Sequence, residues 1–268
     1  MSYNDRGVCA LPLEAAAAQS MLDKIHSPPQ QMTDLNVYEF GELNGHYIVI
    51  AYLPNGVYGT VSAATVISRM RDVVVSKLVE RYGGVIQYDY GKAIQGGRFE
   101  PTVSLNQSPQ ALLTRMGQLQ ARQITGDNAI SKILGTVLEQ NLNMRERLLP
   151  PEQHMDYLFN ILYCHVTKDS DCKGCGKDQL VKQQPRDSKA PVIRFGLVAS
   201  GDRVEAAGLM NELPKLVIQG ICDYCDSHKQ KQWQGYAALT AAAYAELLVS
   251  AMPVPIKINS GLPNKARN

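Results

Sequence analysis

The chain has little net charge, no long apolar run and few cysteines for its length. Among 268 residues, 27 Lys and Arg balance 25 Asp and Glu, which leaves a formal net charge of +2. This balance gives no reason to expect a nucleic-acid or membrane partner. The apolar runs are broken well before the length of about 20 residues that a transmembrane helix needs. The N-terminal residues do not show a charged region followed by an apolar stretch, so a secretory signal peptide is not expected.

Six cysteines in 268 residues do not indicate a disulfide scaffold. Reduced thiols and a cytoplasmic location are therefore expected. The apolar fraction of 45% is that of an ordinary globular protein. A chain of this length can bury one substantial core, either as one large domain or as two small ones.

Runs of strand type alternate with helical patterns along the chain, which predicts an α/β fold with a mainly parallel sheet. The expected strands are 9–13, 47–53, 72–76, 192–199 and 215–222, with a further strand and a long loop in 83–97. The expected helices are 14–25, one that ends at 70, 109–122, 128–143, 205–211 and 233–252. Residues 148–191 are polar and predict an insertion loop with one short helix at 155–163, and residues 253–268 predict a frayed tail.

The segment from Gln219 to Lys229 is the most informative one. The apolar run 216–218 leads through Gly220 to Asp223, at the point where a strand would stop. In open α/β sheets, ligands bind outside the carboxyl ends of the strands. An aspartate at that place suits acid–base chemistry, although a helix-capping or turn aspartate is the alternative.

Two further places offer groups for chemistry. Glu14 follows the expected strand 9–13, and its alternative role is that of a first-turn glutamate favoured by the helix dipole. The loop around Gly56, Gly59 and Thr60 precedes a helix, so its backbone N–H groups could bind an anion. A plain tight turn would account for the same glycines.

A pair of cysteines, Cys172 and Cys175, has the spacing of half a metal-binding knuckle. Cys164 and His165 lie upstream and could complete a set of four ligands. A tetrahedral zinc site usually draws on a second well-spaced pair, and the adjacent Cys-His is awkward. The expectation is therefore a reduced loop without a ligand, and no metal or organic cofactor.

The segment from Gln219 to Lys229 resembles a strand-end motif of the purine nucleoside phosphorylase/uridine phosphorylase superfamily, which also contains nucleosidases. The resemblance runs from about Val8 to Pro253, and its nearest form is the fungal domain often fused to NACHT or ankyrin modules. It is carried by five more ordered blocks: 8–14, 56–64, 83–92, 195–202 and 205–210. It implies a three-layer α/β domain over residues 1–252, with a central mixed, mostly parallel sheet flanked by helices.

The resemblance also implies cleavage of the N-glycosidic bond of a purine nucleoside or nucleotide, by hydrolysis or by phosphorolysis. A nucleoside is the implied partner, phosphate is a co-substrate only in the second case, and a homo-oligomer is left open. A nucleoside-sensing, signalling-associated or degraded domain without activity is the alternative. The implied roles are Asp223 as the acid that protonates the base, Glu14 as the group that activates water, Glu205 as the ribose ligand, Cys222 and Val204 in the base pocket, and Gly56, Gly59 and Thr60 at the phosphate.

Two gaps separate this chain from the pattern it resembles. A buried strand and a glycine-rich turn are expected before Asp72, and a helix with a further strand is expected between Asp202 and Glu205. Arg203 and Val204 also replace the residues, including a ribose-packing Met, that would precede Glu205. Absent sheet strands leave unpaired backbone groups and a divided core. Either the sheet closes around the losses, or the chain is a degraded or mis-spliced copy with missing strands.

Overall fold

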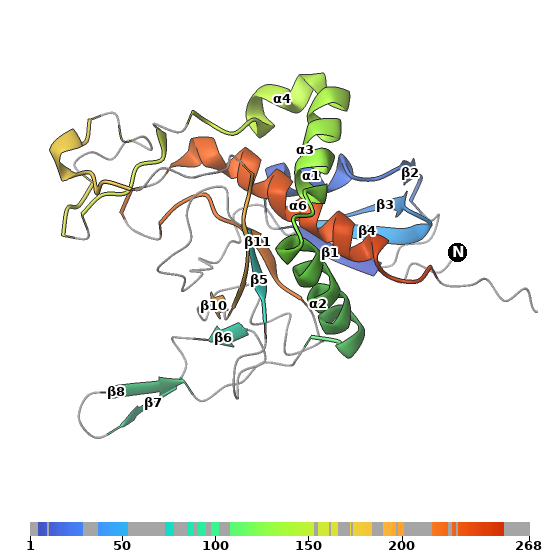
Figure 1. Ribbon diagram of the computed structural model, residues 1–268, viewed down its shortest axis with the longest axis horizontal. Helices are drawn as coiled ribbons and strands as arrows, with labels where there is room; N and C mark the ends of the chain where they lie inside the picture. The colour runs from blue at the N-terminus through green and yellow to red at the C-terminus, as the bar shows by residue number, and fades with distance from the viewer. Residues whose placement is uncertain are drawn as a thin grey trace, which may run out of the picture.

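A computed structural model provides the structure of the chain. The residues it describes are 5–9, 11–28, 37–52, 73–77, 85–87, 91–94, 98–101, 108–152, 155–160, 162–165, 172, 174–183, 190–196, 198–200, 216–224, 227–228 and 230–254. Helices and strands of both orientations are present, which confirms the α/β class (Figure 1). The first strand begins at Asp5 and includes the charged residues Asp5 and Arg6.

The N-terminal sheet has four strands in the order β1-β4-β3-β2. These are β1 (Asp5–Cys9), β4 (His46–Tyr52), β3 (Tyr38–Leu43) and β2 (Lys24–His26). β1 is parallel to β4, whereas β3 is antiparallel to both β4 and β2. The two-residue turn Asn44-Gly45 joins β3 to β4 with φ angles of 49° and 81°. Such a turn needs positive φ at both positions, which Asn-Gly tolerates best.

A second sheet has the order β11-β5-β9. Its strands are β11 (Ile218–Gly220), β5 (Val73–Ser76) and β9 (Ile193–Gly196). β5 is parallel to β9 and antiparallel to β11. Two smaller pairs accompany it, a parallel one of β10 (Val198–Ser200) with β6 (Val85–Gln87) and an antiparallel one of β7 (Gly91–Ile94) with β8 (Arg98–Pro101).

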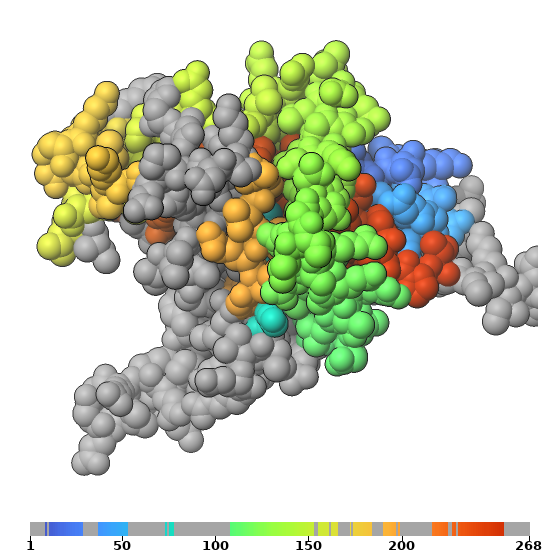
Figure 2. Space-filling model, in the orientation of Figure 1, coloured from blue at the N-terminus to red at the C-terminus, as the bar shows by residue number. Residues whose placement is uncertain are grey.

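Helix α6 (Gln234–Ser250) lies at the centre of the molecule (Figure 1). It packs against β11 and β5 and also against four helices, which are α1 (Pro12–Gln19), α2 (Gln110–Ile124), α3 (Ala129–Gln140) and α4 (Leu142–Leu148). Figure 2 shows the green side chains of α2, α3 and α4 on the surface beside red α6. The main core therefore gathers around α6, with Trp233, Leu239 and Tyr244 among its fully buried side chains.

Three expected elements are wrong in detail. The strand expected at 9–13 lies earlier in the chain, because β1 ends at Cys9 and Pro12, whose fixed φ suits the first helical position, begins α1. The helix expected at 14–25 ends at Gln19, and Lys24 already belongs to β2. The short helix expected at 155–163 is replaced in its described residues by a β-bridge between Phe159 and Leu180.

The segment expected as an insertion loop lies beyond the amino end of α6, where Figure 1 shows it in yellow. Besides the bridge, it contains the short 3-10 helix η2 (Lys177–Gln179). Most of the expected tail, from 255 onward, lies outside the described residues. None of the helices in the described ranges is long and apolar enough to cross a membrane.

Candidate functional site

Asp223 lies three residues after the end of β11, in a bend of the chain. Ile221 is buried, whereas Cys222, Asp223 and Tyr224 are half-buried. Because β11 is antiparallel to β5, with Gly220 paired to Val73, Asp223 leaves the sheet beside the amino end of β5. The strand-end position of Asp223 was expected, but the antiparallel direction of its strand was not.

The chain before Asp223 approaches α6 closely. Gly220 faces Ala237, and a Cβ atom at Gly220 would overlap the backbone of Ala237. Only glycine permits this contact without moving the strand away from the helix. Cys222 and Tyr224, on either side of Asp223, pack against the main core. Residues 220–224, called the Asp223 segment below, are therefore held in place by contacts before and after Asp223.

Polar contacts join the chain after Asp223 to residues 155–183. The Tyr224 hydroxyl donates to Asp156 Oδ1 at 2.6 Å. The Gln230 side chain forms two hydrogen bonds with the backbone of Tyr157, accepting at 3.2 Å and donating at 2.6 Å. Trp233 Nε1 donates to the backbone oxygen of Met155 at 3.1 Å. The expected insertion is thus bound to the segment that carries the candidate acid.

Glu14 is the third residue of α1, in the first turn. Its Oε2 accepts a hydrogen bond from the backbone N–H of Leu11 at 3.1 Å. This contact satisfies a donor that the helix itself leaves open, and the carboxylate also suits the positive end of the helix dipole. A carboxylate has further lone pairs, so the capping contact leaves acceptor capacity for a water molecule.

Three polar residues that meet near the carboxyl end of β4 were not predicted from the sequence, and they are Tyr52, Glu39 and Gln19. The Tyr52 hydroxyl donates to Glu39 Oε2 at 2.6 Å and accepts from Gln19 Nε2 at 2.7 Å. Burial and the hydrogen bond to Glu39 raise the pKa of Tyr52 to about 12. In the parallel register Tyr52 pairs with Cys9, whose pKa is raised to about 12 by burial and then by the charge of Glu14.

These groups form a connected polar patch beside Glu14. The Asn44-Gly45 turn was the sequence signal for the β3–β4 hairpin that brings Glu39 to Tyr52. The other predicted site residues, Val204, Glu205, Gly56, Gly59 and Thr60, lie outside the described residues. Of the two catalytic candidates that are described, Glu14 belongs to α1 and Asp223 follows β11, and both of these elements pack against α6.

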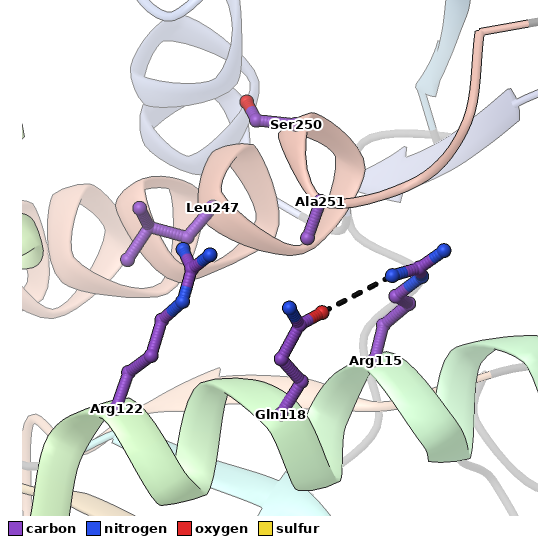
Figure 3. A pocket seen from close by; sticks show the side chains of 6 residues that line it. All are labelled: Arg115, Gln118, Arg122, Leu247, Ser250 and Ala251. Carbon is purple, nitrogen blue, oxygen red and sulfur yellow. Dashed lines mark hydrogen bonds between the residues drawn. The ribbon is translucent and has the colours of Figure 1, made fainter.

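A cleft of about 270 Å³ lies between α2 and α6 (Figure 3). Arg115 and Arg122 project from α2 toward the carboxyl-terminal turns of α6, and Arg115 donates to Gln118 Oε1 at 3.2 Å. Leu247, Ser250 and Ala251 form the opposite wall. Of the predicted site residues that the structure describes, none lines this cleft.

No protein-family model matches the chain. A nucleotide-binding leucine-rich repeat (NLR)-like protein of Hyaloscypha variabilis is 34% identical over 92% of this chain. The match spans only 29% of that longer protein.

Solved nucleosidase structures share the fold. A 5′-methylthioadenosine/S-adenosylhomocysteine nucleosidase from Neisseria meningitidis, in complex with methylthio-immucillin-A, has a TM-score of 0.50 and 10% identity, covering 94% of this chain and 100% of its own. A Helicobacter pylori nucleosidase with 5′-methylthioadenosine in the active site gives the same values. At such identity the likeness confirms the fold that the resemblance implied, and the fold alone.

Proposed function

We propose that the chain binds a purine nucleoside and cleaves its N-glycosidic bond by hydrolysis. The observation that carries the proposal is a half-buried aspartate, Asp223, just beyond a strand end in a fold shared with nucleosidases. Cleavage needs a group that protonates the departing base, and a carboxyl group placed just beyond a strand end can supply that proton. The shared fold supports the reaction class, and the position of Asp223 supports its role.

Two carboxyl groups account for both proton transfers of the proposed reaction. Asp223 gives its proton to a ring nitrogen of the purine while the bond between that base and the ribose C1′ breaks. The oxygen of water forms the new bond to C1′, and Glu14 accepts the proton that the water loses. Glu205 would hold the ribose hydroxyls, since a carboxylate accepts two hydrogen bonds from a vicinal diol. Cys222 and Val204 would contact the base.

A domain that senses nucleosides without turning them over is the second candidate. It is favoured by one observation, the match to less than a third of a longer NLR-like protein. In such an arrangement the nucleoside would act as a signal, and the fold would serve binding alone.

The two candidates are separated by measuring base release and binding on the same protein. Purified chain is incubated with adenosine, inosine or 5′-methylthioadenosine, and free base is quantified by chromatography. We expect release, and a decrease of roughly 10²–10⁴-fold in Asp223→Asn, the usual contribution of a positioned acid. The control is Glu139→Gln, an exposed carboxylate on α3, which should keep full activity. Calorimetric binding of a nucleoside without any release would favour the sensing domain instead.

A further inference from the structure

A second cluster of chemically capable side chains lies outside the candidate nucleoside site. His165, Cys172 and Cys175 each offer one ligand atom, and these atoms all lie within 4.8 Å of one another. Both cysteines are buried, each with 8% of its surface exposed, and His165 is half-buried. Thiolate sulfur and imidazole nitrogen are the ligands that zinc prefers.

The backbone explains why the two sulfurs meet. The N–H of Cys175 donates to the oxygen of Cys172 at 3.2 Å, which closes a tight turn between the two cysteines. The N–H of Gly176 then donates to the Tyr163 hydroxyl at 2.9 Å, which ties this turn to the chain just before His165. The spacing Cys-x-x-Cys in a turn is the usual way in which a short loop offers two ligands to one metal.

The separations are close to those of a metal centre. With Zn–S near 2.3 Å and Zn–N near 2.0–2.1 Å, tetrahedral ligand atoms lie about 3.5–3.8 Å apart. The three ligand atoms are within 4.8 Å, so a movement of about 1 Å or less would bring them to a common ion. Rotation of side chains supplies such a movement without a change of fold.

The described residues around the cluster offer only a small hydrophobic core. Phe159, Cys172 and Cys175 form a small cluster of their own, apart from the main core, with Tyr157, Tyr163 and Leu180 against it. A cavity of about 140 Å³ borders both cysteines. Regular structure is sparse in the described residues of this segment, where a β-bridge joins Phe159 to Leu180 and η2 follows Cys175. Small units with so little core are commonly stabilised by a bound metal.

The cluster is linked to the chain that follows Asp223. The backbone N–H of His165 donates to Ser227 Oγ at 3.0 Å, and the rings of His165 and His228 meet edge to face at 5.3 Å. His228 is buried and stacks on Phe159 at 4.1 Å and on Tyr163 at 5.5 Å. A metal that fixes His165 would therefore also fix Ser227 and His228.

We propose that His165, Cys172 and Cys175 bind one Zn²⁺ ion, with water in the fourth position, and that this ion braces the Asp223 segment. Binding exchanges two thiol protons for the metal, so two protons leave and the pair of thiolates balances the charge of the ion. This site replaces the expected pair of unliganded thiols. Zinc binding does not depend on the proposed nucleosidase activity, and its test needs no substrate.

The first experiment measures zinc in the full chain purified under reducing conditions. Elemental analysis should give one zinc per chain, and Co²⁺ substitution should give the visible bands of a tetrahedral site with a charge-transfer intensity of two thiolates. Cys172→Ser, Cys175→Ser and His165→Ala should each weaken zinc binding at least tenfold. Cys164→Ser is the matched control, because Cys164 is exposed and adjacent to His165 but outside the cluster, and it should retain the ion.

Three results would overturn the site. They are the absence of zinc after incubation with Zn²⁺ and desalting, retention of zinc in both cysteine variants, and a disulfide between Cys172 and Cys175 in place of the metal. If the variants do not fold, the cobalt spectrum of the unaltered chain still counts its thiolate ligands.

The brace is tested separately by hydrogen exchange. Removal of zinc with a chelator should raise exchange in residues 223–233 at least tenfold, while exchange in α3 should stay constant. Equal protection of residues 223–233 with and without the ion would overturn the brace and leave only a local metal site.

Discussion

The Tyr224 hydroxyl donates a hydrogen bond of 2.6 Å to Asp156 Oδ1, across 68 positions of sequence. Gln183 Nε2 donates to the same Tyr224 oxygen at 3.1 Å. Because Tyr224 directly follows Asp223, this network sets the place of the candidate acid from a distant part of the chain. Partly buried hydrogen bonds to a charged group contribute about 1.5–3 kcal/mol to stability.

Removal of the Tyr224 hydroxyl should therefore destabilise the fold by about 1–3 kcal/mol, because Asp156 is left with a poorer partner. Tyr224→Phe, Asp156→Asn and the double variant are compared by urea unfolding. The coupling energy should fall within about 0.5–3 kcal/mol, as for residues in contact. Additive effects of the two substitutions would mean that the hydrogen bond does not form in solution.

Much of the fold was predictable from local sequence patterns. The expected ranges 47–53, 109–122 and 233–252 overlap β4, α2 and α6 over most of their length. Each of these elements carries its own signal, since β-branched residues fill the strand and alanines fill α6. The helix that was expected at 14–25 failed because the apolar pattern of 21–25 continues past Gln19, while the backbone turns there into β2.

The candidate site was predictable only in part. The position of Asp223 after a strand follows from the apolar run and the glycine before it. The partners of Tyr52 do not follow, because Glu39 and Gln19 are 13 and 33 positions away and meet it only in the folded sheet. The direction of β11 likewise depends on pairing between distant strands, which no local pattern encodes.

The contact between Gly220 and α6 gives a second prediction. A methyl group at Gly220 would overlap the backbone of Ala237, so strand and helix must separate. Gly220→Ala should destabilise the fold by about 1–3 kcal/mol, as other overpacked sites do. Gly117→Ala in α2 is the matched control, because no atom lies within 4 Å of its added Cβ. Loss of a helical glycine should stabilise that variant by about 0.5–1 kcal/mol. Equal urea midpoints for the two variants would contradict the close approach.

Tyr244 supports a prediction about stability and pH. Its hydroxyl is buried and has no hydrogen-bond partner among the described residues, so Tyr244→Phe should be neutral or stabilising by about 1 kcal/mol at pH 7. Burial raises the pKa of Tyr244 above its ordinary value of 10.0. The folded chain then keeps a proton that the unfolded chain loses, so stability falls as pH rises above 10.

The same linkage applies to Cys9 between its ordinary pKa of 9.0 and its folded pKa of about 12. Each group contributes a slope of up to about 1.4 kcal/mol per pH unit within its window. Urea unfolding from pH 8 to 11 should show a smaller alkaline loss for Tyr244→Phe above pH 10 and for Cys9→Ser above pH 9. Slopes identical to that of the unaltered chain would show that neither group titrates differently on folding.

The choice between hydrolysis and phosphorolysis rests on Glu14. Water needs a base, whereas phosphate is already nucleophilic, so base release should not depend on added phosphate. Glu14→Gln should reduce release roughly 10²–10⁴-fold. Its amide oxygen can still accept from the N–H of Leu11, so stability should change little. A strict phosphate requirement would instead assign roles to Gly56, Gly59 and Thr60.

The two gaps in the chain predict low stability. Their flanking segments, 53–72 and 201–215, lie outside the described residues, and the first of them connects the two main sheets along the chain. Two absent strands would remove about ten buried apolar side chains, each worth about 1.5–3 kcal/mol. A whole domain is stable by only about 5–15 kcal/mol. We therefore expect thermal unfolding below about 65 °C, the upper end for ordinary mesophilic domains, together with aggregation through open strand edges. Calorimetry of the full chain measures this midpoint. A cooperative transition well above about 65 °C would show that the sheets have closed around the gaps and that the absent strands cost the fold little.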